Sequence, residues 1–135
     1  MSSEDHKATI RRLADAFNKR DLTFIEHAFS PHFVLHTAST PGWPQGLEGA
    51  RQMFTTMLTT APDIRLTIED LFAADDKVAV RWTFRGTHTG PSLSRGAPTG
   101  QPFTIVAVAI YRFANGKIEE DWGVDAQWQT GAVWQ

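Results

Sequence analysis

The sequence predicts an α+β fold, a cone-shaped barrel in which three N-terminal helices pack on a strongly curved, mainly antiparallel sheet. Apolar residues recur at helical spacing up to residue 60, whereas from residue 64 they alternate with polar residues, as in strands. The chain has 135 residues, of which 41% are hydrophobic and none is cysteine. Because that length suffices for a core without disulfides, we expect residues 1–135 to form a single domain.

Three helices are expected ahead of the sheet. Two serines near the N-terminus can cap the first, and the acidic residues of its first turn suit the helix dipole. A short second helix is predicted over residues 22–29, ended by Pro31, and a third over residues 47–60. Their buried faces are expected to carry Ile10, Leu13, Ala14, Phe17, Ile25, Phe29, Ala50, Met53, Phe54, Met57 and Leu58.

Five strands are expected. A short, extended segment over residues 32–37 precedes the third helix, and an alternating strand over residues 64–72 follows it. Residues 78–84 alternate in the same way and form a half-buried strand. Residues 103–113 are apolar on both faces, which indicates a central strand or an interface strand. The last strand is predicted over residues 118–128.

The turn at Asn115-Gly116 decides which side chains of the last two strands share a face. A two-residue turn would pair odd with even positions, whereas a three-residue turn with Gly116 in a left-handed bulge would pair odd with odd. We prefer the bulged turn because it gathers the bulky apolar residues on one face: Val106, Val108, Ile110, Ile118, Trp122 and Val124. The opposite face then carries Ala107, Ala109, Tyr111, Glu119, Asp121, Gly123 and Asp125.

This second face has two interpretations. Alanine and glycine leave volume, and a partly desolvated aspartate can have its pKa raised into a useful range, so the face can form the floor of a cavity. It can equally be the solvated acidic face of an edge strand. The sequence alone does not choose between them.

Composition excludes several classes of function. With 13 basic and 15 acidic residues, the chain has no positive charge to spare for nucleic acid, and no apolar run approaches a membrane span. The polar, charged N-terminus is no secretion signal, so we expect a cytoplasmic protein. Motifs for phosphates, dinucleotides or a nucleophilic serine are missing, and we expect no cofactor. His32 and His36 would lie about 13 Å apart along a strand, too far to share a metal ion.

Several segments occur in an order and spacing typical of one family. They are Gly49 with the helix after it and residues 61–64, 76–82, 86–90, 98–100, 111–113 and 116–122. Through these segments, over residues 8–128, the chain resembles the SnoaL-like polyketide cyclases, within the ketosteroid isomerase-like and nuclear transport factor 2-like superfamily. The resemblance implies the cone-shaped fold and places His36 where the family often has a pocket histidine. It says less about the reaction, because this fold hosts many chemistries.

The chain departs from the family at the catalytic pair. The resemblance implies a general acid/base aspartate just after Trp122 and a histidine three positions before Arg112. Those positions hold Gly123 and Ala109 here. The remaining acids near this point are Asp121 and Asp125, each two residues from Gly123 and on the same face. Asp125 is our first choice as base, and His36 is the candidate hydrogen-bond donor to a substrate carbonyl.

The candidate ligand contacts share an aromatic, sulfur-containing or small side chain near the expected cavity. Trp82 and Trp122 can equally be core or sheet packing, and His88 can equally be a structural residue of its turn. His36 can equally hydrogen-bond across the early strand. The full set is Trp43, Met53, Met57, Trp82, His88, Ala109, Trp122 and Gly123.

Three functions fit these observations. The first is an enzyme with an apolar pocket that performs cofactor-free acid/base chemistry on a hydrophobic, carbonyl-bearing, polyketide-like small molecule; an isomerase or an epoxide hydrolase of the same fold is a variant of it. The second is a non-catalytic binding or accessory protein, and the third is an interaction module. In each case the apolar faces of the sheet exceed what three helices cover, so we expect a homodimer.

Overall fold

The computed structural model describes residues 2–37, 42–92 and 96–126. Its elements follow the predicted order of helices first and long strands second, which confirms the α+β class. The predicted end of the last strand, residues 127–128, lies outside the described residues. The elements are α1 (Ser3–Asn18), α2 (Phe24–Ala28), β1 (Phe29–Leu35), α3 (Gly46–Thr60), β2 (Arg65–Ala74), β3 (Lys77–Thr87), β4 (Pro102–Ala114) and β5 (Lys117–Ala126).

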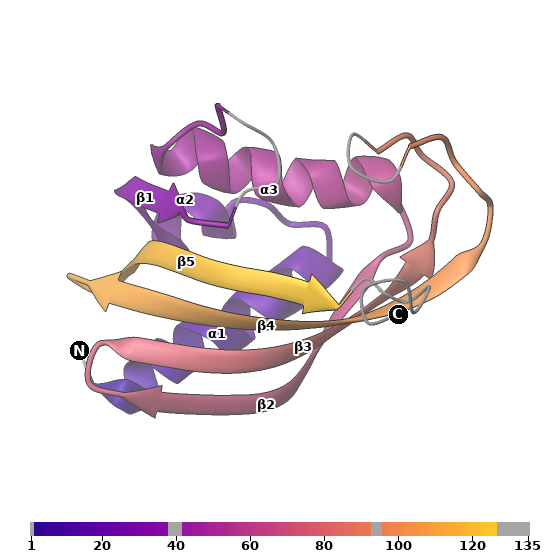
Figure 1. The fold of residues 1–135 in the computed structure, drawn as a ribbon. Coiled ribbons are helices and arrows are strands. Elements are labelled where there is room, and N and C mark those ends of the chain that lie inside the picture. Colours follow the sequence, from indigo (N-terminus) through magenta and orange to yellow (C-terminus); the bar gives the residue numbers. More distant parts are fainter. Residues whose placement is uncertain (1, 38–41, 93–95, 127–135) are drawn as a thin grey trace.

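The five strands form one curved sheet in the order β1-β5-β4-β3-β2. Neighbouring strands are antiparallel except β1 and β5, which run parallel. The sheet is open, since β1 and β2 are its two edges and do not pair. The helices lie on its concave side, with α3 facing the sheet (Figure 1). The predicted cone-shaped α+β fold, with helices packed on a strongly curved and mainly antiparallel sheet, is therefore confirmed.

The core sits where the helices meet the inner face of the sheet. The buried positions of α1 include Ile10, Leu13 and Phe17, which confirms the predicted periodicity of this helix. Phe54 of α3 is central to the aromatic packing, because its ring centroid lies 5.1 Å from that of Phe24 and 5.5 Å from that of Phe17. These contacts join α3 to the two helices that precede it.

The turn between β4 and β5 differs from the expectation. Asn115 and Gly116 form a two-residue turn, because Ala114 pairs directly with Lys117. Both turn residues have positive φ, 52° and 77°, as a type I′ turn requires. The predicted three-residue bulged turn is therefore wrong.

A bulge nevertheless exists one step further into the hairpin. Arg112 pairs with Glu120 but Phe113 pairs with Ile118, so Glu119 is an extra residue in β5. On the side of the bulge away from the turn, odd positions of β4 pair with odd positions of β5, as predicted, but the bulge at Glu119 and not the turn produces this pairing. Between the bulge and the turn, odd positions of β4 pair with even positions of β5. Ile118 is therefore fully buried and does not lie on the apolar face predicted for it.

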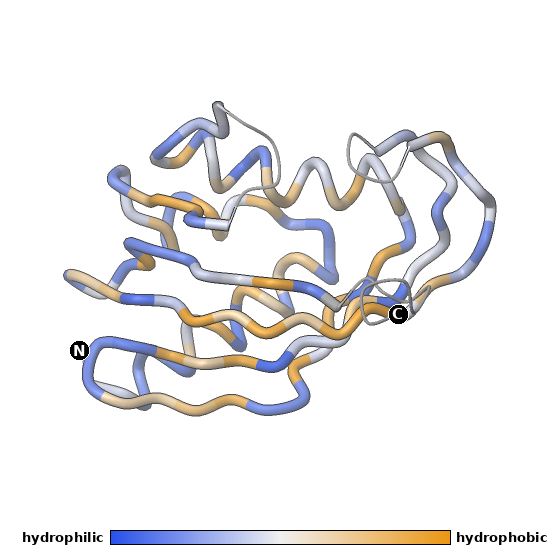
Figure 2. The backbone as a smooth tube through the Cα atoms, in the orientation of Figure 1, coloured by the Kyte–Doolittle hydropathy of each residue, from blue (hydrophilic) through white to orange (hydrophobic). Residues whose placement is uncertain are grey.

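The two faces of the sheet differ in burial as the pairing requires. The inner face carries the buried odd positions of β4, whereas large apolar side chains on the other face stay exposed. Figure 2 shows how much of β4 is hydrophobic. Within the described ranges, no helix has the length and apolar character needed to cross a membrane. We call the following residues the apolar outer face: Phe72, Val106, Val108, Ile110, Trp122 and Val124.

Candidate functional site

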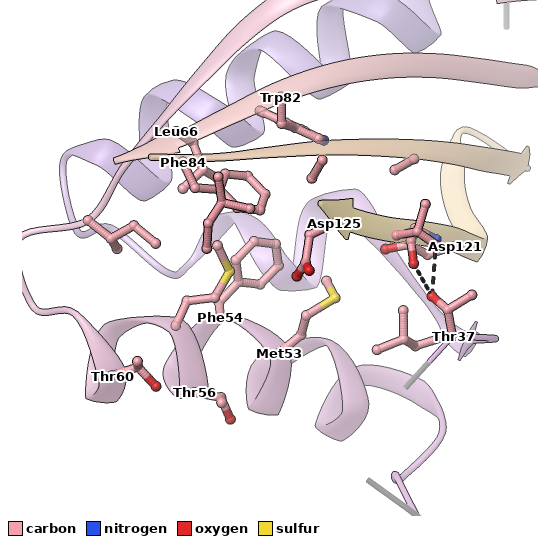
Figure 3. Close-up of a pocket in the computed structure, with 18 of the residues that line it drawn as sticks. Thr37, Met53, Phe54, Thr56, Thr60, Leu66, Trp82, Phe84, Asp121 and Asp125 are labelled. Carbon is pink, nitrogen blue, oxygen red and sulfur yellow. Dashed lines mark hydrogen bonds between the residues drawn. The ribbon is translucent and has the colours of Figure 1, made fainter. Parts of the chain in front are cut away.

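A cavity of about 480 Å³ opens between α3 and the inner face of the sheet. That volume suits a small organic molecule. Its wall is mostly apolar, with side chains from both layers, and its polar residues include two carboxylates of β5 (Figure 3). The acidic inner face is therefore the floor of a cavity, and of the two interpretations of this face the structure supports the first.

Asp121 lies on this floor and is almost completely enclosed, with 4% of its surface exposed. Its Oδ1 atom is buried and has no hydrogen-bond partner among the residues that the structure describes. Burial raises the pKa of Asp121 to about 7, because the surrounding apolar groups disfavour the charged carboxylate. A carboxyl group in this state can both accept and donate a proton near neutral pH.

Small residues give the Asp121 carboxyl its room. Ala109 and Gly123 face each other across β4 and β5, and both line the cavity. The space next to Gly123 is taken by the carboxyl of Asp121, which leans over the glycine. Gly123 and Ala109, which stand where the resemblance implies an aspartate and a histidine, thus leave space on the cavity floor, and the Asp121 carboxyl fills part of that space.

Tyr111 is the cross-strand partner of Asp121 and also lines the cavity. Its hydroxyl oxygen accepts a hydrogen bond from Trp82 Nε1 at 3.2 Å, and both rings are buried. Burial and, second, the nearby Asp121 carboxyl raise the pKa of Tyr111 well above its ordinary value. Tyr111 therefore stays protonated next to an aspartate that titrates.

Asp125 has a different environment from Asp121. It also faces the cavity and points toward Met53 of α3 (Figure 3), but its side chain is exposed. It pairs with Ala107, four residues along β5 from Asp121, which corresponds to about 13 Å on an extended strand. The two candidate aspartates therefore have different environments, because Asp121 is buried and Asp125 is exposed.

Most of the predicted ligand contacts lie on the cavity. Trp43 lines it from the loop before α3, where its Nε1 donates to the carbonyl oxygen of Gly49 at 3.1 Å. Met53 and Met57 line it from α3, and Trp82 lines it from β3. Together with Ala109 and Gly123 on the floor, these side chains place apolar surface on both sides of the space that a ligand would fill.

The structure places His36 on the other side of the sheet. Its ring stacks on that of Trp122 with centroids 4.6 Å apart and planes 5° apart, and its Nε2 lies 2.8 Å from Glu120 Oε1. Glu120 also pairs with Arg112, and the hydrogen bond from Arg112, followed by the one with His36, lowers the pKa of Glu120. Neither His36 nor Trp122 is among the residues that line the cavity, and Trp122 points away from it because even positions of β5 beyond the bulge face outward.

His88 also lies outside the cavity wall. It is buried, with its ring Nδ1 3.5 Å from Thr99 Oγ1. Its backbone N–H donates to Gln101 and its carbonyl accepts from Gly100, so it fastens the ends of the loop between β3 and β4. The geometry therefore supports a structural role for His88 rather than a ligand contact.

Tyr111, Thr37 and Phe54 are among the cavity residues that were not singled out as site residues. Tyr111 could have been found, because it is the single tyrosine and shares the odd face with Ala109. Thr37 follows β1, and its hydroxyl bonds the backbone carbonyl and N–H of Gly123. This contact joins segments 86 residues apart, so no local pattern reveals it. Phe54 was assigned to the core, and it is both core and wall.

No cluster of three or more metal-binding side chains occurs in the described part of the chain.

The family model for SnoaL-like polyketide cyclases matches residues 7–130, nearly the whole chain. The chain belongs to the SnoaL-like polyketide cyclase family. No curated protein matches it significantly.

Solved structures of family-like proteins superpose on nearly the whole chain. TsrD from Streptomyces laurentii has a TM-score of 0.84 at 23% identity, with 98% of this chain and 96% of that chain covered. AclR, a proposed hydroxylase from Streptomyces galilaeus, has a TM-score of 0.77 at 26% identity over 98% and 96% of the chains. IdmH, a proposed polyketide cyclase from Streptomyces antibioticus, has a TM-score of 0.73 at 31% identity over 89% and 91%.

Proposed function

We propose that this member of the SnoaL-like family is an enzyme in which Asp121 performs acid/base chemistry on a hydrophobic, carbonyl-bearing small molecule of the polyketide type. The observation that carries the proposal is the buried Asp121 carboxyl, which faces an apolar cavity with its Oδ1 unpartnered in the described residues. A buried polar atom without a hydrogen-bond partner lowers the free energy of unfolding, so it calls for an explanation. Functional sites are a common location for such groups.

The chemistry follows from the pKa. A base must be ionised to take a proton, yet basic enough to hold it, and a carboxyl with a pKa of about 7 meets both conditions near neutral pH. The proton that such a group removes most readily from an apolar ketone is the one next to the carbonyl. No charged substrate group is required, which agrees with the apolar wall of the cavity.

The position of this carboxyl distinguishes the chain from the pattern that the sequence suggested for its family. Gly123 and Ala109 cannot take part in proton transfer, and Asp121 lies two residues before the expected position. The reacting atom of the substrate is therefore expected next to the Asp121 carboxyl, which itself occupies the space beside Gly123. Trp43, Met53, Met57 and Trp82 would then contact its apolar part.

We also propose that the apolar outer face joins two copies of this chain into a homodimer. Val124 keeps 65% of its surface exposed and Val108 keeps 47%, although these two residues are cross-strand neighbours. Phe72, Ala79, Ile110 and Trp122 form a second apolar row across four strands. A continuous apolar surface of this kind is unusual on a monomer, and an identical surface on a second copy would cover it.

The proposed activity can be tested before the natural substrate is known. The probe is 2-tetralone, a bicyclic ketone with acidic C1 hydrogens between the carbonyl and the aromatic ring. In D₂O, the protein should accelerate the exchange of these hydrogens for deuterium, followed by proton NMR. Asp121→Asn should reduce this acceleration about 1,000-fold, within the usual range for a general base, while the matched variant Asp125→Asn should change it by less than about tenfold.

The alternatives predict other outcomes. A binding or accessory protein would bind 2-tetralone but leave its exchange rate at the protein-free value. An interaction module would not bind it. Exchange that depends on Asp125 rather than Asp121 would favour the base indicated by the sequence and contradict the proposed role of Asp121.

A further inference from the structure

A second hollow, of about 440 Å³, lies where β2 begins, β3 ends and β4 begins. No described residue of β5 lines it, so it is separate from the Asp121 carboxyl. Phe103 lines both this hollow and the main cavity. We call this space the arginine hollow, because Arg65 and Arg85 form part of its wall.

Arg65 and Arg85 face each other directly across β2 and β3. Their neighbours Leu66 and Phe84 line the main cavity, so the two arginines point to the opposite side of the sheet. Side chains directly opposite each other in an antiparallel pair have Cβ atoms about 5 Å apart. Two guanidinium groups can therefore reach the same small ligand.

Neither of these arginines is neutralised by a carboxylate. Among the residues that the structure describes, neither guanidinium forms an ion pair or a hydrogen bond. Arg81, on the same face of β3, shows the contrast, because its cross-strand partner is Asp70 and its Nε lies 2.7 Å from Asp70 Oδ2. Like charges directly opposite each other destabilise a sheet, so the pair of Arg65 and Arg85 calls for an explanation.

The other polar groups of the arginine hollow leave room for an anion. Asp63 is an acidic residue on its wall, and its two carboxylate oxygens accept from the backbone N–H and the hydroxyl of Thr87, each at 2.8 Å. Thr67 and Thr104 also line the hollow, and their hydroxyls make no hydrogen bond to another described residue. These two hydroxyls can donate to an oxyanion that lies between the arginines.

We infer that Arg65 and Arg85 form a binding site for a dianionic phosphate group, with Thr67 and Thr104 as further donors. A guanidinium presents a planar fork of N–H donors that matches phosphate oxygens, and two guanidinium groups balance two negative charges. A carboxylate carries one charge, which one arginine satisfies. Bound phosphate replaces the repulsion between the arginines by the attraction of both to the anion. This inference does not depend on the proposed function of Asp121.

The phosphate group has two sources, the free ion and a monoester of a small organic molecule. Pro102 and Phe103 place apolar surface on the wall of the arginine hollow, against which the organic part of a monoester would lie. Inorganic phosphate and phenyl phosphate are therefore the two probes.

Phosphate binding can be measured at the arginines themselves. In the ¹⁵N-labelled full-length protein, the Nε–H resonances of Arg65 and Arg85 should shift on titration with inorganic phosphate at constant ionic strength. We expect a Kd of about 1 mM, as a few charge-assisted hydrogen bonds at an exposed site provide. The Nε–H resonance of Arg81, which Asp70 already holds, should move little.

Arg65→Gln and Arg85→Gln assign these resonances and test the site. Each should weaken phosphate binding about tenfold, since each removes one charged hydrogen-bonding partner. The matched control is Arg11→Gln, which removes the same charge from an exposed position of α1 and should change the Kd by less than about twofold. Equal weakening in all three variants would indicate general electrostatic attraction and overturn the site.

The melting temperature gives a second readout. Because a ligand of the folded state stabilises it, about 20 mM phosphate should raise the melting temperature of the unmodified protein by about 5 °C over sodium chloride of the same ionic strength. The rise in Arg85→Gln should be less than half as large. An equal rise in both proteins would contradict the site.

The two probes identify the source of the phosphate group. Tighter binding of phenyl phosphate than of inorganic phosphate would assign a monoester, and the reverse order would assign the free ion. If neither probe at about 20 mM, a concentration well above the expected Kd, shifts the resonances of Arg65 and Arg85, the inference is overturned.

Discussion

Asp121 Oδ1 lies 3.0 Å from the point where the Cβ of any side chain on Gly123 would stand. The Cβ of Ala109 is 3.4 Å from the same point. The backbone of Gly123 does not need a glycine, because its φ is not in the left-handed region. We therefore attribute the glycine to a need for space, because the absence of a side chain at this position lets the Asp121 carboxyl lie on the floor of the cavity.

Gly123→Ala should move the Asp121 carboxyl and lower activity. A Cβ at 3.0 Å from Oδ1 is closer than an ordinary contact, so the Asp121 carboxyl must shift by a few tenths of an ångström. We expect a roughly tenfold loss of 2-tetralone exchange, since small displacements of a base weaken proton transfer, with little change in the melting temperature. Unchanged exchange in Gly123→Ala would show that the space is not needed.

Asp121 should make the protein less stable as the pH rises from about 4 to about 7. The folded-state pKa of about 7 lies above the ordinary value of 3.8, so within this window the folded protein keeps a proton that the unfolded chain releases. At 1.36 kcal/mol per pH unit, the loss of unfolding free energy is about 4 kcal/mol, and it levels off once both states are ionised above pH 7.

Urea unfolding at pH 4 to 8 measures this dependence, with Asp121→Asn as the reference. Asp5, Asp21, Asp63 and Glu120 have lowered pKa values, so their contribution to stability is lost as the pH falls, in the opposite sense. They are common to both proteins and cancel in the difference. Parallel pH curves for the two proteins would mean that Asp121 is ionised throughout, which is incompatible with a raised pKa for this carboxyl.

His36→Ala should leave activity within about twofold of the unmodified protein. The ring stacks on Trp122 and pairs with Glu120 on the outer side of the sheet, where no substrate is expected. Loss of these partly exposed contacts should lower the unfolding free energy by about 0.5–1 kcal/mol. A large loss of 2-tetralone exchange with unchanged stability would instead return His36 to the site, and His32→Ala, at an exposed position of β1, gives the baseline.

Val108→Lys should convert the proposed dimer into monomers. A charged side chain at the centre of the apolar outer face would be buried without a partner in the dimer, which weakens association by about tenfold or more. Sedimentation equilibrium measures the mass, and Thr55→Lys, an exposed position on α3, adds the same charge elsewhere. An unmodified protein that is monomeric at about 100 µM would contradict the proposal.

The fold could be predicted from the sequence because its signals are local and repeated. The spacing of Ile10, Leu13 and Phe17 determines a helix face, and alternation determines each long strand. The bulge at Glu119 could not be predicted, because it depends on how β5 pairs with β4 and not on any feature of β5 alone. That single residue decides which side chains of β5 face the core, and it explains the misplacement of Ile118.

The site was predictable only in outline. Which residues share the cavity floor followed from the odd-with-odd pairing, so Asp121, Asp125, Ala109 and Gly123 were identified together. The sequence did not show which of the two aspartates is buried. The burial of Asp121 depends on α3 and on the segment that follows β1, and both are distant from Asp121 in the sequence. The position of His36 in the family pattern did not indicate that its ring stacks on Trp122, because that contact depends on how the end of β1 lies against β5.

The protonation of Asp121 is the central claim and can be measured directly. Aspartate labelled with ¹³C at the side-chain carboxyl gives one NMR resonance per aspartate, and Asp121→Asn identifies the resonance of interest by its disappearance. We predict that this resonance titrates with a midpoint near pH 7 in the folded protein, while the exposed aspartates titrate near their ordinary values. A midpoint below about pH 5 for Asp121 would contradict the claim, since an ordinary carboxyl titrates in that range.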